Sequence, residues 1–187
     1  MITAVQLIPY RTASDDYASA EHLKAHCARM KQERHPMYLT LDELDRVLQW
    51  KLRGQYGRQR ERRKANTDAV VRFVTGAALS IEHPDLDYEI ELRFGILCSL
   101  RGVGVPVASA ILALVFAERY AVIDFRGWRQ VFGEERTAFS VSDYKRYLRA
   151  VQNLAQELGW SVQEVDLAIW EYDRVNGGKA IASTAAG

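Results

Sequence analysis

Apolar residues recur every three to four positions along most of this chain, the spacing that places them on one face of an α-helix. Ser, Thr, Asn or Asp residues precede many of these stretches, where they can cap the first turn of a helix. Apolar runs that could form strands are short and isolated, at residues 5–8 and 120–123. The pattern therefore predicts an all-α fold, a bundle of about eight helices. We expect these helices to begin near residues 14, 40, 66, 85, 105, 124, 140 and 161.

The capping sequences are the most specific local signals. In the segment 40–43, the Thr40 hydroxyl and the Glu43 carboxylate can each accept a hydrogen bond from a backbone amide of the other's turn, which is a capping box. Segments that begin at Ser140 and Ser161 have the same form. The run 105–117 is apolar nearly all round, which predicts a central, buried helix.

Size and composition are those of one soluble domain. The chain has 187 residues, 48% of them apolar and 26% charged, and we expect a single helical domain at 1–176, followed by a flexible tail at 177–187. No apolar run approaches the length of a membrane span, and no secretory signal is visible. Two cysteines, Cys27 and Cys98, cannot form a four-thiolate cluster and fit a reducing compartment. We expect a cytoplasmic, nucleoid-associated protein.

A net charge of +1 conceals one strongly basic segment, which has seven basic residues and a single acidic one, Glu61. Such a segment is typical of a surface that contacts nucleic-acid phosphates. A solvated, arginine-rich loop is the equally open alternative. The seven basic residues are Lys51, Arg53, Arg58, Arg60, Arg62, Arg63 and Lys64.

A glycine hairpin between two expected helices is the most informative motif. Gly102 and Gly104 permit backbone angles and close approaches that a side chain would block. Pro106 suits the first turn of the next helix, and Ala108 allows the two helices to approach closely. Backbone amides at such a helix start can bind a phosphate. An ordinary turn between core helices is the alternative.

The stretch resembles the helix-hairpin-helix motif, which we place at about 93–117. The motif has the pattern apolar-x-x-apolar-x-Gly-apolar-Gly-x-x-x-Ala-x-x-apolar-apolar, and every defined position is filled. The residues at these positions are Leu97, Leu100, Gly102, Val103, Gly104, Ala108, Ile111 and Leu112.

Together with the sequence that follows it, the hairpin is similar to the helix-hairpin-helix DNA glycosylase superfamily, over about residues 85–133. In that superfamily a catalytic aspartate follows the hairpin after a short apolar stretch, and an arginine comes five positions later. Asp124 and Arg129 match these positions. The resemblance implies a hydrolase that releases a damaged or modified base from double-stranded DNA, with Asp124 as the catalytic residue.

The chain departs from the superfamily pattern at three positions, and these departures limit the chemistry that the resemblance implies. Pro106 stands where bifunctional members have a lysine nucleophile, so the resemblance implies a monofunctional enzyme without lyase activity at that position. Phe125 and Arg126 replace the small polar residues or His that usually follow the aspartate.

The resemblance also implies how DNA is held. Backbone groups of the hairpin would bind a phosphate, and its carbonyls could hold a structural monovalent cation; we expect no other cofactor. The resemblance implies DNA contacts along the hairpin, at Gly102, Val103, Gly104, Val105 and Val107, and a cation held by the carbonyls of Cys98, Leu100 and Val103. Arg126, Arg129 and the basic segment could add further phosphate contacts.

Alternative roles stay open for several residues. Asp124 could serve only as a helix N-cap, and the chain could be a non-catalytic DNA-binding module or a helical interaction domain. His22 and His26 lie one helical turn apart, as zinc ligands can, although an ordinary amphipathic helix explains them as well. We interpret Trp50, Trp160 and Trp170 as packing residues, and Asp166 and Asp173 as exposed or capping residues, with a cleft lining as the alternative. A monomer is expected.

Overall fold

The computed structural model describes residues 1–11 and 15–177, and in these ranges its regular secondary structure is helical, with no strand. The all-α prediction is confirmed. The α-helices are α1 (Ala4–Leu7), α2 (Asp15–Glu33), α3 (Leu41–Leu52), α4 (Arg60–Arg63), α5 (Asp68–Leu79), α6 (Leu86–Leu97), α7 (Val105–Val115), α8 (Phe125–Phe132), α9 (Val141–Leu158) and α10 (Val162–Val175), with 3₁₀ turns η1 (Ile8–Tyr10) and η2 (Arg53–Gln59).

The eight expected helices are all present, and the two additional ones, α1 and α4, have four residues each. The apolar run 5–8 is helical rather than extended, and 120–123 is extended without a strand partner. The flexible tail predicted at 177–187 lies, apart from Gly177, outside the described residues.

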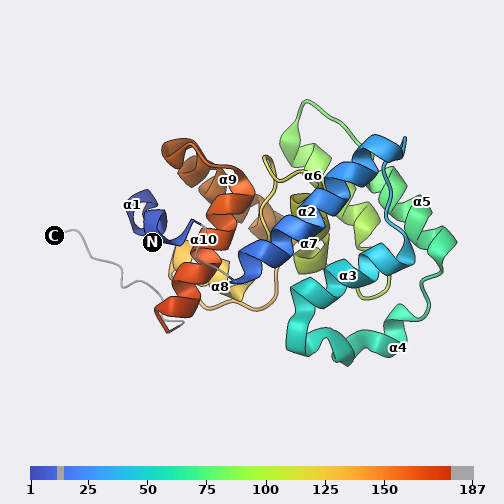
Figure 1. The fold of residues 1–187 in the computed structure, drawn as a ribbon, viewed down its shortest axis with the longest axis horizontal. Helices are drawn as coiled ribbons and strands as arrows, with labels where there is room; N and C mark the ends of the chain where they lie inside the picture. The colour runs from blue at the N-terminus through green and yellow to red at the C-terminus, as the bar shows by residue number, and fades with distance from the viewer. Residues whose placement is uncertain (12–14, 178–187) are drawn as a thin grey trace.

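The helices form two groups (Figure 1). The first group is α2 to α7, in which α7 packs against α2, α3 and α6. The second group is α1, α8, α9 and α10, in which α10 contacts the other three helices. The first residues of the chain belong to the second group, because the Ile2 amide donates to the Gln130 carbonyl over 3.0 Å. A contact between α6 and α9 connects the two groups.

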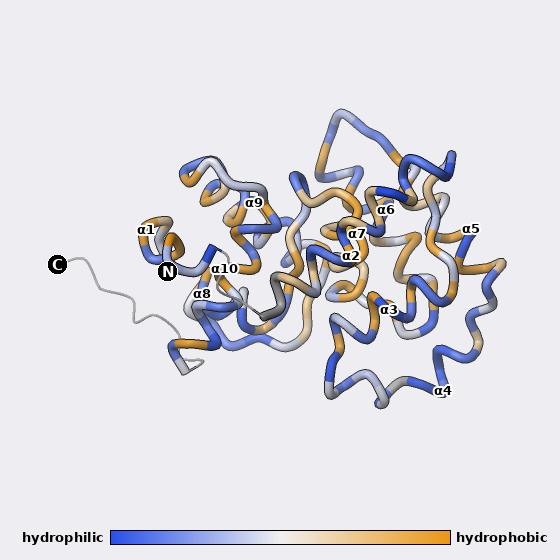
Figure 2. The backbone as a smooth tube through the Cα atoms, viewed as in Figure 1, coloured by the Kyte–Doolittle hydropathy of each residue, from blue (hydrophilic) through white to orange (hydrophobic). Residues whose placement is uncertain are grey.

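Helix α7 is the centre of the first group. Every residue from Val107 to Leu114 is buried, and the hydropathy of the tube is high along this helix (Figure 2). This confirms the prediction of a buried helix that is apolar on all sides. Among the described residues, no helix is both long enough and apolar enough to span a bilayer.

The predicted caps set the helix starts. Capping boxes are present at Thr40, Ser140 and Ser161, where each side chain accepts from the backbone amide three residues later. Asp85 and Asp124 cap α6 and α8 through their carboxylates. The C-terminal end of α3 and the N-terminal ends of α7 and α8 line one hollow, at the junction of the two helical groups.

Candidate functional site

The hairpin between α6 and α7 has the backbone that its glycines suggest. Gly102 has a φ of 82°, in the left-handed region that favours glycine. Gly104 is the N-cap of α7 in an extended conformation, and a Cβ at this position would meet nothing closer than Pro106 Cδ, at 4.0 Å. Packing inside the protein therefore does not require glycine at position 104.

Several backbone amides of the hairpin point to no protein acceptor. Among the residues that the structure describes, none accepts a hydrogen bond from the amides of Gly102, Gly104 or Val105. The Val107 amide differs from our expectation, because it donates to the Gly104 carbonyl over 2.9 Å and closes the first turn of α7. The Val103 amide likewise donates to the Leu100 carbonyl. Three amides at this helix start are thus open to an external anion.

A buried asparagine fixes the hairpin to the end of the basic segment. Asn66 Nδ2 donates to the Arg101 carbonyl over 2.9 Å, and the Arg101 amide donates back to Asn66 Oδ1 over 3.0 Å. The two hydrogen bonds form a closed amide pair between the α4–α5 connection and the hairpin.

Two arginines of the basic segment share a groove with the hairpin. The groove has a volume of about 560 Å³, and Arg58 and Arg62 line it together with residues 98–104. Both arginines are exposed. Sequence positions 40 residues apart thus come together as a basic surface beside the open amides.

The other basic residues of the segment go elsewhere. Arg60 and Lys64 line a neighbouring hollow against α3. Arg63 is buried, and its guanidinium donates to the Tyr56 carbonyl and stacks on the Tyr56 ring. Burial therefore removes Arg63 from the exposed basic surface at which we expected DNA contacts, and its cation supports the η2 turn.

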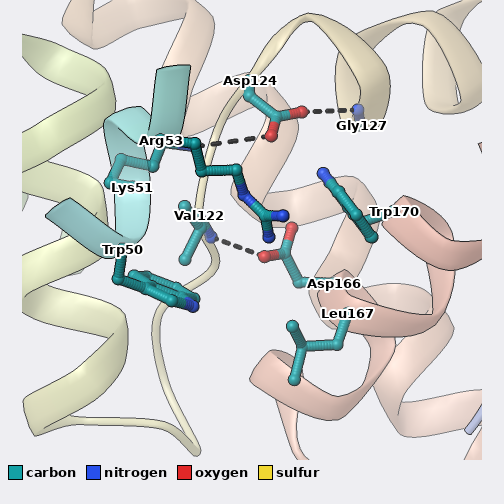
Figure 3. A pocket seen from close by; sticks show the side chains of 9 residues that line it. All are labelled: Trp50, Lys51, Arg53, Val122, Asp124, Gly127, Asp166, Leu167 and Trp170. Carbon is teal, nitrogen blue, oxygen red and sulfur yellow. Dashed lines mark hydrogen bonds and ion pairs between the residues drawn. The ribbon is translucent and has the colours of Figure 1, made fainter. Parts of the chain in front are cut away.

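Asp124 combines the two roles that the sequence left open. Its Oδ1 accepts hydrogen bonds from the amides of Arg126 and Gly127, over 3.0 and 2.9 Å, which makes it the N-cap of α8. Its Oδ2 lies 3.4 Å from Lys51 Nζ. The carboxylate also lines a pocket (Figure 3). The cap uses one oxygen and leaves the other directed at the pocket.

This pocket lies between the two helical groups. Residues of α3, of the extended segment before α8 and of α10 line it, and its volume is about 40 Å³, room for a few water molecules. The lining residues are Trp50, Lys51, Arg53, Val122, Asp124, Gly127, Asp166, Leu167 and Trp170 (Figure 3).

An outer hollow of about 650 Å³ connects the pocket with the hairpin groove. It shares Lys51, Arg53, Asp124 and Trp170 with the pocket. It shares Leu52, Gln55, Pro106 and Thr137 with the hairpin groove. The open amides, the two exposed arginines and Asp124 therefore border one continuous surface depression.

Lys51 belongs to the pocket rather than to the outer surface. Its side chain is only 9% exposed, and its ammonium donates to the Ile123 carbonyl over 3.1 Å as well as facing Asp124. The expectation that Lys51 contacts DNA phosphates therefore needs correction, because its charge is directed inward at the carboxylate.

Asp166 is a buried acid in the wall of the pocket, contrary to our interpretation as an exposed or capping residue. Its Oδ1 accepts from the Tyr147 hydroxyl over 2.6 Å, and its Oδ2 accepts from the Val122 amide over 3.0 Å. Burial raises the pKa of Asp166 to about 7. The hydrogen bond from Tyr147 lowers this pKa, and the charge of Asp124 raises it further.

Gly127, which also lines the pocket, lies against Tyr147. A Cβ at position 127 would overlap the Tyr147 hydroxyl, so glycine is needed there.

Arg126 and Arg129 are both engaged within the protein. Arg129 donates to both oxygens of Asp173 over 2.9 Å, and Arg126 donates to the same carboxylate over 3.1 Å. Asp173 is fully buried, contrary to our interpretation of an exposed or capping residue, and it also accepts from Gln130. The prediction that the two arginines contact phosphates stays untested, but their present role is to neutralise a buried acid.

The proposed metal sites find little support. Within residues 1–11 and 15–177, no three His, Cys, Asp or Glu side chains gather as metal ligands do, and His26 pairs with Glu43 over 2.8 Å. For the monovalent cation, the carbonyl of Leu100 already accepts from the Val103 amide, which leaves it one further lone pair. That cation stays a prediction.

Sequence reasoning missed the walls of the pocket. Trp50 and Trp170 were interpreted as packing residues, and a cleft lining was only the alternative for Asp166, yet all three line the cavity. Their spacing along α3 and α10 is that of any amphipathic helix, so no local signal distinguishes them. Only the meeting of α3 with α10 reveals their position.

Comparisons of the chain with protein-family models, with curated proteins and with solved structures found no significant match. The resemblance to the helix-hairpin-helix glycosylases therefore depends on the sequence motif alone.

Proposed function

We propose that this protein binds double-stranded DNA and hydrolyses the N-glycosidic bond of a modified base, in the manner of a monofunctional helix-hairpin-helix DNA glycosylase. One observation carries the proposal. The Asp124 carboxylate lines a pocket that continues, through the outer hollow, into the groove of the hairpin and the exposed arginines Arg58 and Arg62. An anion-binding hairpin beside a pocket with a carboxylate suits an enzyme that holds a backbone and acts on a flipped nucleotide.

The DNA backbone would lie along the hairpin groove. The open amides of Gly102, Gly104 and Val105 are suited to one phosphate, and the guanidinium groups of Arg58 and Arg62 to its neighbours. These contacts are independent of base sequence and position the duplex. The target nucleotide would then rotate through the outer hollow toward Asp124.

The chemistry would depend on Asp124 and Lys51. Cleavage of the N-glycosidic bond builds positive charge on the sugar, and a carboxylate beside it lowers the barrier and can deprotonate the attacking water. The two amides at Oδ1 hold Asp124 in a fixed orientation. The Lys51 ammonium, 3.4 Å from Asp124 Oδ2, can donate a hydrogen bond to the departing base, which gains negative charge as the bond breaks.

The variant Asp124→Asn tests this function. Asn remains a good N-cap, so the fold and the DNA affinity should survive, whereas base release should fall by about 100-fold or more. Release is measured as abasic sites in duplexes that carry a panel of damaged and modified bases. Asp85→Asn is a matched control, because Asp85 caps α6 through its carboxylate in the same way and does not line the pocket. Base release by Asp124→Asn at the rate of the unmodified protein would refute the assignment.

A non-catalytic DNA-binding module is the second candidate. Phe125 and Arg126 after the aspartate favour it, because Arg126 is paired with Asp173 and does not extend the polar site. Retardation of duplex DNA on gels without base release from any duplex of the panel would support this candidate over the enzyme. Absence of retardation would refute both.

A further inference from the structure

We propose that Arg53 closes the pocket while it is empty, and that its guanidinium occupies the place of a planar, positively charged heterocycle such as an N-alkylated nucleobase. The inference rests on the proposed function only in naming a nucleobase, and its test requires neither DNA nor base release.

Arg53 reaches across the pocket from one helical group to the other. It follows the last residue of α3, and its Cζ lies 4.7 Å from the centre of the Trp170 ring on α10. The side chain crosses the space between Trp50 and Trp170 (Figure 3). Arg53 lines both the pocket and the outer hollow, so it stands at the boundary between them.

The backbone of Arg53 is unusual. It has a φ of 46° and a ψ of −121°, and it is the one non-glycine residue with a positive φ in the part of the chain that the structure describes. Its amide still donates to the Gln49 carbonyl and ends α3. A residue in this region is strained and is held there by its surroundings. Relaxation of this turn would withdraw the guanidinium from Trp170.

The dimensions of the pocket require such a movement. With Arg53 in place the pocket holds a few water molecules and no purine ring. The outer hollow is more than ten times larger, at about 650 Å³ against 40 Å³. Arg53 belongs to the basic segment that continues to Arg58, so a DNA phosphate offers its guanidinium an alternative partner. Phosphate binding would thus open the pocket.

The residues that line the pocket favour a positively charged, planar ligand. Once the guanidinium leaves, the Trp170 face remains beside the Lys51–Asp124 pair and Asp166, and a flat cation can restore the cation–π contact. Arg126 lies 5.1 Å from the same Trp170 ring, but its pairing with buried Asp173 holds it in place. In addition, Trp50 Nε1 is buried and has no acceptor among the described residues, so it can donate to the ring of a ligand.

Tryptophan fluorescence titrations of the full chain test this proposal. The ligands are 1-methyladenosine, which is a planar cation at pH 7, and adenosine, its neutral counterpart. We expect Arg53→Ala to bind 1-methyladenosine about tenfold more tightly than the unmodified protein does, and adenosine weakly in both cases. Methylguanidinium should compete with 1-methyladenosine in Arg53→Ala, because it reproduces the missing side-chain group. Arg149→Ala is the matched control, because Arg149 is an exposed arginine that pairs with Asp87 and lines none of these hollows, and it should leave nucleoside binding unchanged.

Three results would overturn the proposal. Equal affinity of Arg53→Ala and the unmodified protein for 1-methyladenosine would show that Arg53 does not close the pocket. Equal binding of adenosine would remove the preference for a cation. Undiminished binding in Arg53→Ala/Trp170→Ala would place the ligand elsewhere. Arg53→Gln, which keeps the length of the side chain without its charge, replaces Arg53→Ala if thermal melting shows that the latter is unfolded. If the protein releases bases but fails these binding tests, only the closure of the pocket by Arg53 is refuted. If it binds the cation selectively but releases no base, only the proposed enzymatic function is refuted.

Discussion

The ammonium of Lys51 lies 3.4 Å from Oδ2 of Asp124, and the pair joins the last turn of α3 to the first turn of α8. The lysine side chain is 9% exposed and the aspartate side chain 23% exposed. Solvent therefore weakens this interaction less than it weakens a surface ion pair. The ion pair connects the basic segment with the proposed catalytic carboxylate. Lys51, which we expected on the DNA-binding surface, therefore lines the pocket.

Lys51→Met removes this ammonium and keeps the aliphatic length of the side chain. We expect base release to fall tenfold or more, because Asp124 loses its counter-charge and the departing base loses a donor. DNA affinity should change by less than about twofold, since a buried cation releases few DNA counterions. Lys64→Met is the control, because Lys64 is exposed and pairs with Glu61. Unchanged base release would limit Lys51 to a packing role.

Gly104→Ser separates the stability of the hairpin from its binding of phosphate. Ser is a better N-cap than most residues, and a Cβ at position 104 has room within the protein, so thermal stability should be equal or higher. The added side chain stands over the open amides and should weaken duplex binding by about tenfold. Affinity equal to that of the unmodified protein, in a stable variant, would argue against a phosphate at this site.

Arg58→Glu/Arg62→Glu tests the groove beside the hairpin. Each lost phosphate contact should lower the slope of log affinity against log salt by about 0.9, so the pair should lower it by roughly two. Arg29→Glu/Arg149→Glu carries the same change of charge on exposed residues away from the hairpin groove and should alter the slope less. A slope that is the same in both double variants would mean that Arg58 and Arg62 are solvated surface.

Asp166 should make stability depend on pH. Its pKa is raised from 3.8 to about 7 in the folded protein. The folded state therefore holds this proton more tightly than the unfolded chain does. The resulting stabilisation is complete below about pH 3.8 and is lost as pH rises through about 7. Relative to Asp166→Asn, the free energy of unfolding in urea should decline between pH 5 and pH 8. All other titratable groups are common to both proteins and cancel in this comparison. Parallel curves of unfolding free energy against pH for the two proteins would therefore contradict a proton on Asp166.

Asp173 should be essential for the second helical group. Asp173→Ala leaves Arg129, which is 11% exposed, without its main partner and should cost about 3 to 5 kcal/mol in the free energy of unfolding. Glu135 pairs with the same arginine, but its side chain is 68% exposed, so Glu135→Ala should cost about 1 kcal/mol or less. Equal losses in chemical denaturation would show that burial of Asp173 does not control this cluster.

Much of the helical framework is determined by the sequence alone. The Thr40, Ser140 and Ser161 boxes form where the pattern places them, because a cap depends only on residues three positions apart. The buried α7 follows equally directly from an apolar run with no polar face. Gly102 adopts the positive φ that a tight turn requires, and this too is a local property.

The placement of the charged side chains was decided by tertiary structure alone. Neighbours in the basic segment end in different environments, with Lys51 in the pocket, Arg62 at the hairpin groove and Arg63 buried against Tyr56. Asp166 is buried because Tyr147 of α9 and the Val122 amide supply hydrogen bonds from distant parts of the chain. Burial of a charge depends on partners that packing brings together, and periodicity along one helix carries no information about them.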